Sequence, residues 1–407
     1  MIDLKVVIMG LGYIGLPTAA QIASRGISVL GVDVNQSVVD TIKKGKIHIV
    51  EPDLDGLVKH VVERGFLKAS TAVEVADVYL IAVPTPFKGN HEPDLKYVEE
   101  ATRMIIPNLK EGNLFIIEST SPVGTTDKMA KIIFEERPEL KGKINIAYCP
   151  ERVLPGKVIY ELENNDRVIG GLDEKSTKAA QDFYRHFVKG ELHATNARTA
   201  EMCKLVENSS RDVSIAFANE LSMICDKAGI NVWELIKLAN KHPRVNILQP
   251  GTGVGGHCIA VDPWFIVSDF KKEAVIIRNA REINNYKTNW VIEKIKSTAL
   301  QFELDNKRKP TIALMGLAFK PDIDDLRESP ALLVADTLLA ENKFKLHLVE
   351  PNLKESTKYN LADYKNINAD IVAYLVAHKQ FRAFTTKAIE LDFCGVKKTE
   401  LKNKINQ

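Results

Sequence analysis

The sequence predicts an α/β protein in which two doubly wound parallel-sheet domains are joined by a long central helical segment. In the first part, short apolar runs alternate with stretches of helical periodicity, which is typical of a parallel sheet covered by helices on both faces. The middle has few helix breakers between residues 199 and 229, and the opening pattern recurs from residue 311. We place the domains at residues 1–195, 196–300 and 301–407.

The first strand–helix–strand unit contains a glycine-rich turn. Its apolar patterns predict a buried strand over 6–9, a helix over 16–25 and a second strand over 28–32. Between the first strand and the helix the chain reads Gly10-Leu11-Gly12-Tyr13-Ile14-Gly15. This is the G-x-G-x-x-G fingerprint of a Rossmann-like dinucleotide-binding unit, in the context that the fingerprint requires.

Each glycine of the fingerprint, and the acid after the second strand, has a physical role in binding a dinucleotide. Gly10 makes the tight turn, Gly12 admits the pyrophosphate and Gly15 lets the helix pack against the strand, while the helix N-terminus offers N–H groups to the phosphates. Asp33, after the second strand, can bind both ribose hydroxyls and would repel a 2′-phosphate, which favours NAD over NADP. The expected cofactor contacts here are Gly10, Gly12, Tyr13, Ile14, Gly15 and Asp33.

Polar or proline-rich segments follow three further predicted strands, 76–83, 114–118 and 144–148. Ligands of open α/β sheets bind outside the carboxyl ends of the strands, so these segments are candidate site loops. They contribute Pro84, Thr85 and Thr120 as cofactor contacts and Glu151 and Arg152 as substrate contacts. Glu151 can act as a general base or can be an ion-pair partner of Arg152 or Arg167.

The central segment carries two groups of candidate catalytic residues on its predicted helices, 199–229, 232–240 and 274–298, and on a loop. Lys204 and Asn208 share a helix face and can stabilise an oxyanion, although such a pair is also common on a solvated helix. Cys258 ends the glycine-rich loop 251–257 and is either a nucleophile or a small buried residue. His257 is expected to be structural.

The last part repeats the opening pattern with predicted strands within 311–320, 346–351 and 369–376. Only Gly316 of the fingerprint is retained, so a second NAD is not expected to bind in the same way. The loop instead carries Lys320 and Arg327, which suit a phosphorylated ligand or belong to an ordinary charged surface loop. The lysine-rich residues 397–407 are expected to be a solvated tail.

Composition excludes several classes of protein. A formal net charge of +2 gives no field that favours nucleic acid, and the short, interrupted apolar runs predict no membrane span. No signal-peptide pattern opens the chain. Five cysteines without a C-x-x-C pair argue against a disulfide framework or a structural metal site and favour reduced thiols in the cytoplasm.

Four separated motifs, in family order over nearly the full chain, resemble the UDP-glucose/GDP-mannose dehydrogenase family. They are the glycine fingerprint, Glu201-Met202-Cys203-Lys204-Leu205-Val206-Glu207-Asn208, Gly255-Gly256-His257-Cys258, and Gly316-Leu317-Ala318-Phe319-Lys320-Pro321 with Arg327-Glu328-Ser329-Pro330. The resemblance implies oxidation of a sugar 6-hydroxyl to a carboxylate, with two NAD used per sugar and no metal. It also implies a homodimer or larger oligomer.

The resemblance further implies the roles of single residues. Cys258 would bind the 6-aldehyde as a thiohemiacetal and then carry a thioester, which water hydrolyses with help from Glu151. Lys204 would stabilise the oxyanions, and the catalytic water would be held by Thr120, Asn208 and Asp262. Substrate contacts would come from Glu151, Arg152, Lys204, Asn208, Gly255, Lys320 and Arg244, the last often from a partner subunit, and Arg327 would lie near the cofactor.

Two stretches, 149–156 and 242–251, resemble the branch of the family that oxidises UDP-N-acetyl-D-mannosamine to its uronic acid for surface polysaccharide. The UDP-glucose branch carries a glutamate where Leu154-Pro155 stand, which disfavours glucose. The alternatives are the same chemistry on UDP-N-acetylglucosamine, UDP-glucose or GDP-mannose, and a two-electron 3-hydroxyacid or 6-phosphogluconate-type dehydrogenase. A nucleotide-sugar or NAD sensor is the non-enzyme alternative.

Overall fold

The protein is described from a computed structural model that covers residues 4–89, 91–154, 156–256, 258–353 and 358–397. The chain divides into two compact units, Met1–Glu207 and Asn208–Gln407. Helix α8 (Ala197–Ala228) begins in the first unit and ends in the second. The three-domain boundaries expected from the sequence stay a prediction.

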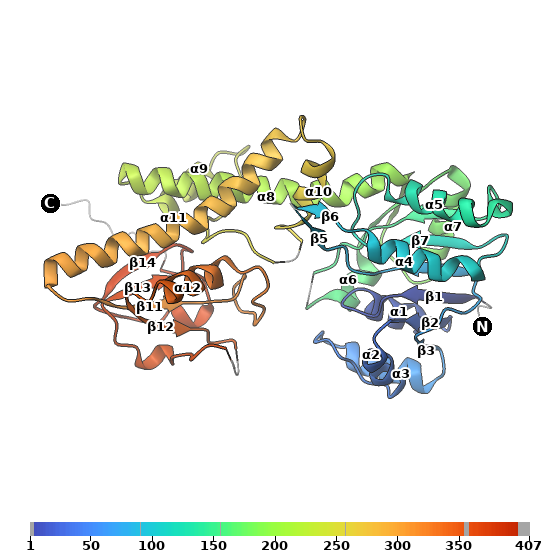
Figure 1. Ribbon diagram of the computed structural model, residues 1–407, viewed down its shortest axis with the longest axis horizontal. Coiled ribbons are helices and arrows are strands. Elements are labelled where there is room, and N and C mark those ends of the chain that lie inside the picture. Colours follow the sequence, from blue (N-terminus) through green and yellow to red (C-terminus); the bar gives the residue numbers. More distant parts are fainter. Residues whose placement is uncertain (1–3, 90, 155, 257, 354–357, 398–407) are drawn as a thin grey trace. The chain divides into compact units, whose positions relative to one another are not determined.

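Within the described residues the first unit contains an eight-stranded sheet in the order β10-β9-β8-β7-β4-β1-β2-β3 (Figure 1). Its strands are β1 (Lys5–Met9), β2 (Ser28–Val32), β3 (Leu67–Ser70), β4 (Val78–Ile81), β7 (Leu114–Ile117), β8 (Asn145–Tyr148), β9 (Arg167–Gly171) and β10 (Leu192–Asn196). Neighbouring strands are parallel except β8 and β9, which are antiparallel. A short hairpin, β5 (Phe87–Lys88) with β6 (Glu92–Pro93), follows β4.

Two apolar cores lie on the two faces of this sheet, because successive side chains of a strand point to opposite faces. Val6 and Ile8 of β1 belong to one core and Val7 and Met9 to the other. The first core is covered by α1 (Gly15–Ala23), α2 (Gln36–Lys43), α3 (Leu54–Glu63) and α7 (Glu174–Tyr184). The second is covered by α4 (Lys96–Ile105), α5 (Thr125–Glu136) and the start of α8. The short helix α6 (Val158–Asn164) packs against α1.

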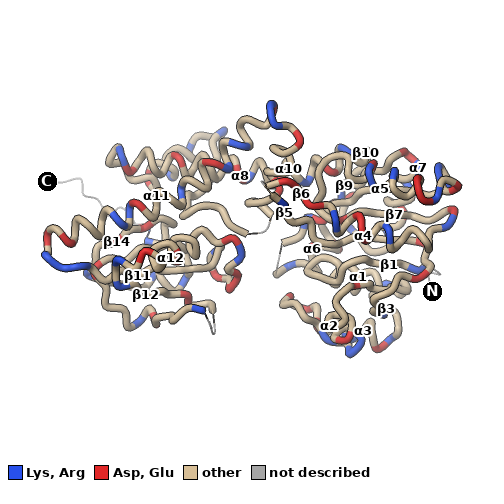
Figure 2. The backbone as a smooth tube through the Cα atoms, in the orientation of Figure 1, with Lys and Arg blue, Asp and Glu red and all other residues tan. Residues whose placement is uncertain are grey.

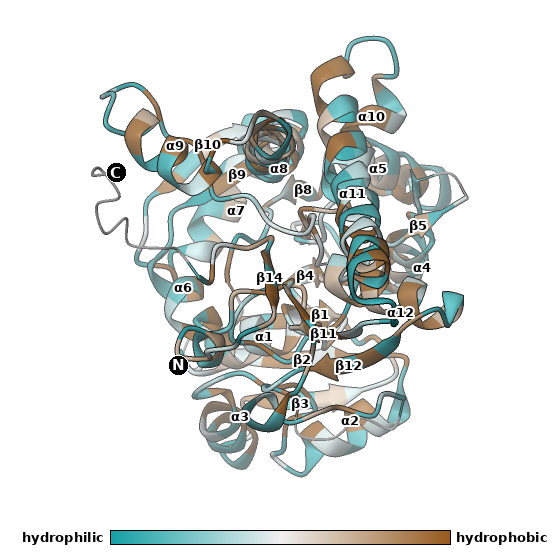
Figure 3. Ribbon diagram, turned by 90° about the vertical axis from the view of Figure 1, so that its left-hand side faces the viewer, coloured by the Kyte–Doolittle hydropathy of each residue, from teal (hydrophilic) through white to brown (hydrophobic). Residues whose placement is uncertain are grey.

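The described part of the second unit contains a parallel four-stranded sheet in the order β12-β11-β13-β14. Its elements are α9 (Val232–Ala239), α10 (Asp262–Asp269), α11 (Val275–Asn306), β11 (Thr311–Met315), α12 (Pro330–Glu341), β12 (Lys345–Val349), β13 (Ile371–Tyr374) and β14 (Ile389–Asp392). Helices α11 and α12 pack on one face, and the other is closed by the 3₁₀ turns η3 (Tyr364–Asn366) and η4 (Lys379–Phe381). Figure 3 shows hydrophobic and hydrophilic residues mixed along α11, whose buried residues include Val291, Ile295 and Ala299.

The eight-stranded sheet, which is parallel except between β8 and β9, the parallel four-stranded sheet and the long helix α8 confirm the predicted fold class. Among the features that the structure adds to the prediction are the antiparallel pairing of β8 with β9, the edge strands β3, β10 and β14, and the extension of α11 to Asn306 beyond the expected end at 298. Lys and Arg are interspersed with Asp and Glu in each unit (Figure 2). No helix among the described residues is both long and apolar enough to cross a membrane.

Candidate active site

The glycine turn after β1 requires glycine at two positions and leaves room at a third. Gly10 has a φ of +91°, and a Cβ on it would lie 2.6 Å from the carbonyl oxygen of Ala82. A Cβ on Gly15 would lie 1.9 Å from the carbonyl oxygen of Gly10. At Gly12, in contrast, no atom of the described residues lies within 4 Å of the Cβ position. The backbone at Gly12 is therefore open to a phosphate group at the start of α1.

The carboxylate of Asp33 is held beside this turn by the backbone. Its Oδ2 accepts from the Leu11 N–H at 2.9 Å and its Oδ1 from the Asn35 N–H at 2.9 Å. The side chain of Tyr13 is exposed, and Ile14 immediately precedes α1. The predicted cofactor contacts over residues 10–15 thus lie together with Asp33 at the carboxyl ends of β1 and β2.

The loops after β4 and β7, which flank β1 on its other side, are hydrogen-bonded to each other. Thr85 Oγ1 donates to the Thr120 carbonyl at 2.7 Å, and Ser119 Oγ accepts from the Val83 N–H at 2.9 Å. Pro84, which stands between Val83 and Thr85 in the sequence, is exposed. The structure therefore places these three predicted residues, Pro84, Thr85 and Thr120, at the same edge of the sheet as the glycine turn.

Glu151 lies in a buried ion pair after β8. Its Oε2 is 2.5 Å from Arg167 Nη1, with side chains only 6% and 2% exposed, and its Oε1 accepts from the Arg152 N–H at 2.7 Å. The Arg167 guanidinium lies over the Tyr184 ring, 5.4 Å from its centre, and Tyr184 Oη donates to Glu118 Oε1 at 2.5 Å. The ion-pair alternative for Glu151 is therefore present in the structure, with Arg167 as the partner.

The carboxyl group of Glu118 and the thiol of Cys149 are buried close to this ion pair, and burial changes the pKa of each. Burial, reinforced by Glu151, raises the pKa of Glu118 to about 7 against the opposing effects of Arg167 and the Tyr184 hydroxyl. Burial also raises the pKa of the Cys149 thiol to about 12, although Arg167 opposes it. Cys149 therefore stays a protonated thiol at neutral pH and is not a nucleophile.

The raised pKa of Glu118 predicts a pH-dependent stability. Between its ordinary value of 4.5 and about 7, the folded chain holds a proton that the unfolded chain has lost, so this group makes the protein less stable as pH rises through that window. Glu118→Gln keeps an acceptor for Tyr184 and removes the titration. We expect urea unfolding at pH 5, 6, 7 and 8 to show a stability gain for the variant that grows with pH. Parallel curves for the two proteins would show that Glu118 is not the titrating group.

The start of α8 is anchored to the loop after β7 by a buried carboxylate. Glu201 accepts hydrogen bonds from the Gly124 N–H at 2.6 Å and from the N–H and hydroxyl of Thr126 at 2.8 and 2.7 Å. Lys204, which is half-buried, follows within one turn. Near the end of this unit, Arg152 pairs with Glu207 at 2.6 Å. Lys204 is thus carried on a helix whose first turn is fixed to the sheet.

The second unit presents Cys258 on an exposed turn. The Cys258 carbonyl accepts from the N–H groups of Val261 at 3.0 Å and Asp262 at 2.8 Å, and α10 begins at Asp262. The Asp262 carboxylate is buried and accepts from Asn208 Nδ2 at 2.5 Å. The structure thus joins two of the predicted catalytic residues, Asn208 and Asp262, and exposes the predicted nucleophile. His257 lies outside the described residues.

The glycines before Cys258 pack against the loop after β11. A Cβ on Gly255 would lie 2.3 Å from the carbonyl oxygen of Glu328, and one on Gly256 would lie 2.8 Å from the ring of Phe319. This loop carries Lys320, which is exposed, and Arg327, which pairs with Asp325 at 2.7 Å. The structure therefore brings the predicted residues Gly255, Lys320 and Arg327 together within one unit.

Three domain models of one protein family match separate parts of the chain. Residues 4–188, 198–286 and 313–398 match the NAD binding, central and UDP binding domains of the UDP-glucose/GDP-mannose dehydrogenase family. The chain belongs to this family. A UDP-N-acetyl-D-mannosamine dehydrogenase of Campylobacter jejuni is 59% identical over 396 residues, 93% of this chain and 96% of the relative. A UDP-N-acetyl-D-mannosamine dehydrogenase of Escherichia coli K12 is 56% identical over 393 residues, 92% of this chain and 94% of the relative.

Solved structures give the same result. A UDP-N-acetyl-mannosamine dehydrogenase of Staphylococcus aureus superposes with a TM-score of 0.86 at 38% identity, covering 96% of this chain and 99% of that one. A UDP-glucose dehydrogenase of Pyrobaculum islandicum gives 0.83 at 26% identity, covering 97% and 95%. The chain is accordingly an NAD-dependent nucleotide-sugar dehydrogenase, as the sequence motifs predicted.

The residues of the glycine turn fit NAD. Open space at Gly12 admits a pyrophosphate, and the Asp33 carboxylate, whose oxygens each retain a second lone pair beside their backbone bonds, can accept from ribose hydroxyls. When bound, NAD supplies a hydride acceptor for the sugar carbon. Arg327, also predicted to contact the cofactor, belongs to the second unit, and its role stays a prediction.

The UDP binding domain repeats the first fold with a changed site. Glu350 follows β12 as Asp33 follows β2, and accepts from the Leu317 N–H at 2.8 Å as Asp33 does from Leu11. Glu350, however, is buried beneath His378, at 2.9 Å from its ring. Because it is buried, the Glu350 carboxylate cannot bind the ribose of a second dinucleotide as Asp33 can.

Three residues of the buried cluster, Glu118, Arg167 and Tyr184, and the helix anchor Glu201 were not singled out as site residues by the sequence. Glu118 and Arg167 were each a single charge next to a strand, which is common in loops. Two signals existed in the sequence: Glu201 opens the family motif that contains Lys204 and Asn208, and Arg167 was one of two ion-pair partners expected for Glu151.

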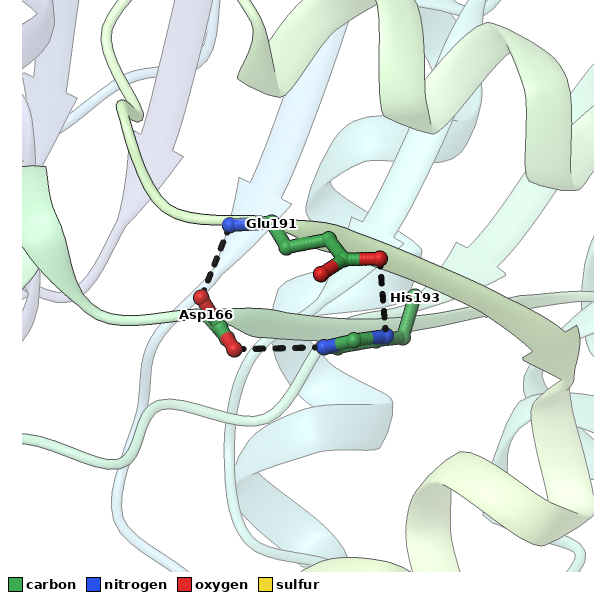
Figure 4. A group of neighbouring side chains, drawn as sticks. All are labelled: Asp166, Glu191 and His193. Carbon is green, nitrogen blue, oxygen red and sulfur yellow. Dashed lines mark hydrogen bonds and ion pairs between the residues drawn. The ribbon is translucent and has the colours of Figure 1, made fainter.

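An exposed group near the sheet edge, Asp166, Glu191 and His193, combines residue types that bind metals (Figure 4). Asp166 Oδ2 lies 3.3 Å from His193 Nε2, whereas Glu191 Oε1 lies 3.7 Å from Nδ1. The carboxylates thus face different ring nitrogens, and the Glu191 N–H and the His193 ring lower the pKa of Asp166. We assign the group to surface ion pairing.

Proposed function

We propose that this chain oxidises UDP-N-acetyl-D-mannosamine to UDP-N-acetyl-D-mannosaminuronate, a building block for surface polysaccharide. The observation that carries the proposal is the set of relatives named for that substrate at 53–59% identity over more than nine-tenths of this chain. A relative from Ralstonia nicotianae, 52% identical, is named an NDP-N-acetyl-D-galactosaminuronic acid dehydrogenase, so another N-acetylated sugar is the second candidate.

The chemistry assigned to the side chains starts from the exposed Cys258. An alcohol at carbon 6 is first oxidised to the aldehyde, losing a hydride and a proton. The Cys258 sulfur then adds to the aldehyde carbon, giving a thiohemiacetal whose carbon loses a second hydride and becomes a thioester. Water breaks the C–S bond, releasing the carboxylate and the thiol. Each sugar therefore consumes one water and reduces two NAD.

The other predicted residues support these steps. The Lys204 ammonium is assigned to the oxygen that carries negative charge in each step, since it is half-buried on an anchored helix. The bond between Asn208 and Asp262 orients two polar groups that can hold the attacking water, together with Thr120. Glu151 is assigned to hydrolysis through the lone pairs not used by Arg167 and the Arg152 N–H.

The remaining predicted contacts belong to the nucleotide sugar. Lys320 suits the diphosphate because it is an exposed cation that follows Phe319, whose Cβ packs against Gly255. Arg152 and Arg244 are assigned to the sugar nucleotide as cations. The cytoplasmic location expected from the cysteine usage stays a prediction.

A panel of nucleotide sugars tests the substrate. We expect kcat/KM for UDP-N-acetyl-D-mannosamine to exceed by at least about tenfold the values for UDP-N-acetylglucosamine, UDP-N-acetylgalactosamine, UDP-glucose and GDP-mannose, which requires only about 1.4 kcal/mol of discrimination. Product masses confirm the uronic acid. Activity on UDP-glucose with none on N-acetylated sugars would overturn the substrate assignment and leave the family chemistry intact.

A homodimer or larger oligomer is part of the proposal. Phe217 and Ile224, seven residues apart on one face of α8, are 54% and 56% exposed, which supports a helix face that a second chain covers. Arg244 is exposed and suits a contact with the partner's substrate. We expect light scattering at assay concentration to give at least twice the chain mass of 45.4 kDa; a monomer would contradict this.

A further inference from the structure

A buried histidine and glutamate lie beneath the loop that carries Lys320. Neither side chain is exposed, and His378 Nε2 lies 2.9 Å from Glu350 Oε2. His378 Nδ1 faces two N–H donors, the Asp322 amide at 2.9 Å and Asn352 Nδ2 at 2.8 Å. Since Nδ1 must accept from both, the ring proton is on Nε2 and is donated to Glu350.

This pair holds the loop at both ends. Glu350 Oε2 accepts from the Leu317 N–H at 2.8 Å and the Ala318 N–H at 2.9 Å. At the other end, Asp322 has a φ of +61°, and its amide is the donor that His378 accepts. A left-handed conformation is unfavourable for a residue other than glycine and persists only where surrounding contacts maintain it. Lys320 lies between these two anchors.

The same loop contacts the glycines that precede Cys258. The ring of Phe319, the residue before Lys320, packs on Gly256 so closely that a Cβ there would lie 2.8 Å from it. The N–H of Phe319 donates to the Asp325 carbonyl at 3.1 Å. A second bond joins Asp322 Oδ1 to the Lys379 N–H at 3.0 Å, which connects the loop to the turn after His378. The loop is thus fixed on several sides while the side chain of Lys320 stays exposed.

We propose that His378 and Glu350 are positioning residues for substrate binding, because they fix the loop 316–322 and so present Lys320 to the diphosphate of the nucleotide sugar. The inference rests on the proposed role of Lys320. The proposal also explains why Glu350 is buried in the second unit: its carboxylate binds the backbone of the loop 316–322. In the first unit, Asp33 also accepts from backbone amides but stays partly open to a ribose.

Two substitutions at an exposed position test this without disturbing the core. Asp322→Pro removes the N–H that His378 accepts and cannot adopt a positive φ, whereas Asp322→Gly keeps the N–H and adopts that φ freely. We expect Asp322→Pro to raise the KM for the nucleotide sugar at least about fivefold, the effect of one lost hydrogen bond, with kcat within about twofold of native. Both variants lose the side-chain bond to the Lys379 N–H, so Asp322→Gly, which keeps the amide bond to His378, should bind more tightly than Asp322→Pro.

Substitution of the histidine separates its two bonds. In His378→Asn the amide oxygen takes the place of Nδ1, and in His378→Gln the amide nitrogen reaches toward Glu350 while the acceptor for Asp322 is lost. We expect the glutamine variant to raise KM more than the asparagine variant, with the Kd for NAD unchanged in both. An equal KM for native protein, Asp322→Pro and His378→Gln would overturn the proposal.

Calorimetry with UDP at pH 8 keeps this proposal separate from the proposed function. If the native protein does not bind UDP, the assignment of Lys320 fails and the proposed function fails with it. If the native protein binds UDP and Asp322→Pro binds it equally tightly, only the positioning role fails. Weaker UDP binding by Asp322→Pro, with NAD binding retained, is the result that we expect.

Discussion

Cys258→Ser is expected to abolish formation of the uronic acid while binding of NAD and of the nucleotide sugar persists. Serine keeps the shape of the side chain on its exposed turn, so the glycine loop and the start of α10 should fold as before. Its hydroxyl is a far poorer nucleophile and leaving group than a thiol. We expect kcat for the four-electron reaction to fall by at least about a thousandfold, the loss of an essential nucleophile.

The first oxidation should survive this substitution better than the second. Conversion of the alcohol to the aldehyde does not use the thiol, so a single turnover can release one NADH and leave aldehyde on the enzyme. Quenched-flow measurement with mass detection distinguishes the two steps. Cys394→Ser is the matched control, because Cys394 lies in the same unit, has hydrogen bonds from its sulfur to the Tyr374 carbonyl and to the Asp392 carboxylate, and has no assigned role. Near-native turnover to the acid by Cys258→Ser would return Cys258 to a structural role.

Arg167→Met is expected to lower the free energy of unfolding by about 3–5 kcal/mol, because it leaves the Glu151 carboxylate buried without its cation. Methionine fills similar space, so the loss reflects mainly the uncompensated charge. Urea unfolding of the two proteins at pH 8 measures this loss. Addition of Glu151→Gln to Arg167→Met should restore part of the stability, since it removes the unpaired charge.

An exposed ion pair of similar length provides the control for this prediction. Arg185 and Asp182 are separated by 2.6 Å, and both side chains are more than half exposed. Arg185→Met should therefore leave unfolding almost unchanged. Equal destabilisation by Arg167→Met and Arg185→Met would show that burial of the Glu151 pair does not matter.

The sequence predicted the parts of the fold that depend on local pattern. The turn at Gly10 and Gly15, the strand over 28–32 and the helix predicted over 199–229 have glycine spacing or periodicity that the sequence itself displays. The antiparallel course of β9 could not be read in this way, because an apolar run of this length fits either direction.

Some residues of the site were likewise found from local patterns, and others were not. Cys258, Asp33 and Lys320 stood in recognisable spacings, whereas the pairing of Glu151 with Arg167 and of Glu350 with His378 joins residues 16 and 28 positions apart. Such pairs depend on how strands and loops pack, which no local pattern contains. The sequence allowed Arg167 as one of two partners for Glu151, and packing selected it.

The count of NADH formed per nucleotide sugar consumed tests the central claim most directly. With UDP-N-acetyl-D-mannosamine limiting and NAD in excess, covalent catalysis at Cys258 predicts two NADH and one uronic acid per sugar, with no free aldehyde during turnover. One NADH per sugar, with aldehyde accumulating in solution, would contradict the account, since it would show a two-electron dehydrogenase that has no use for the thiol.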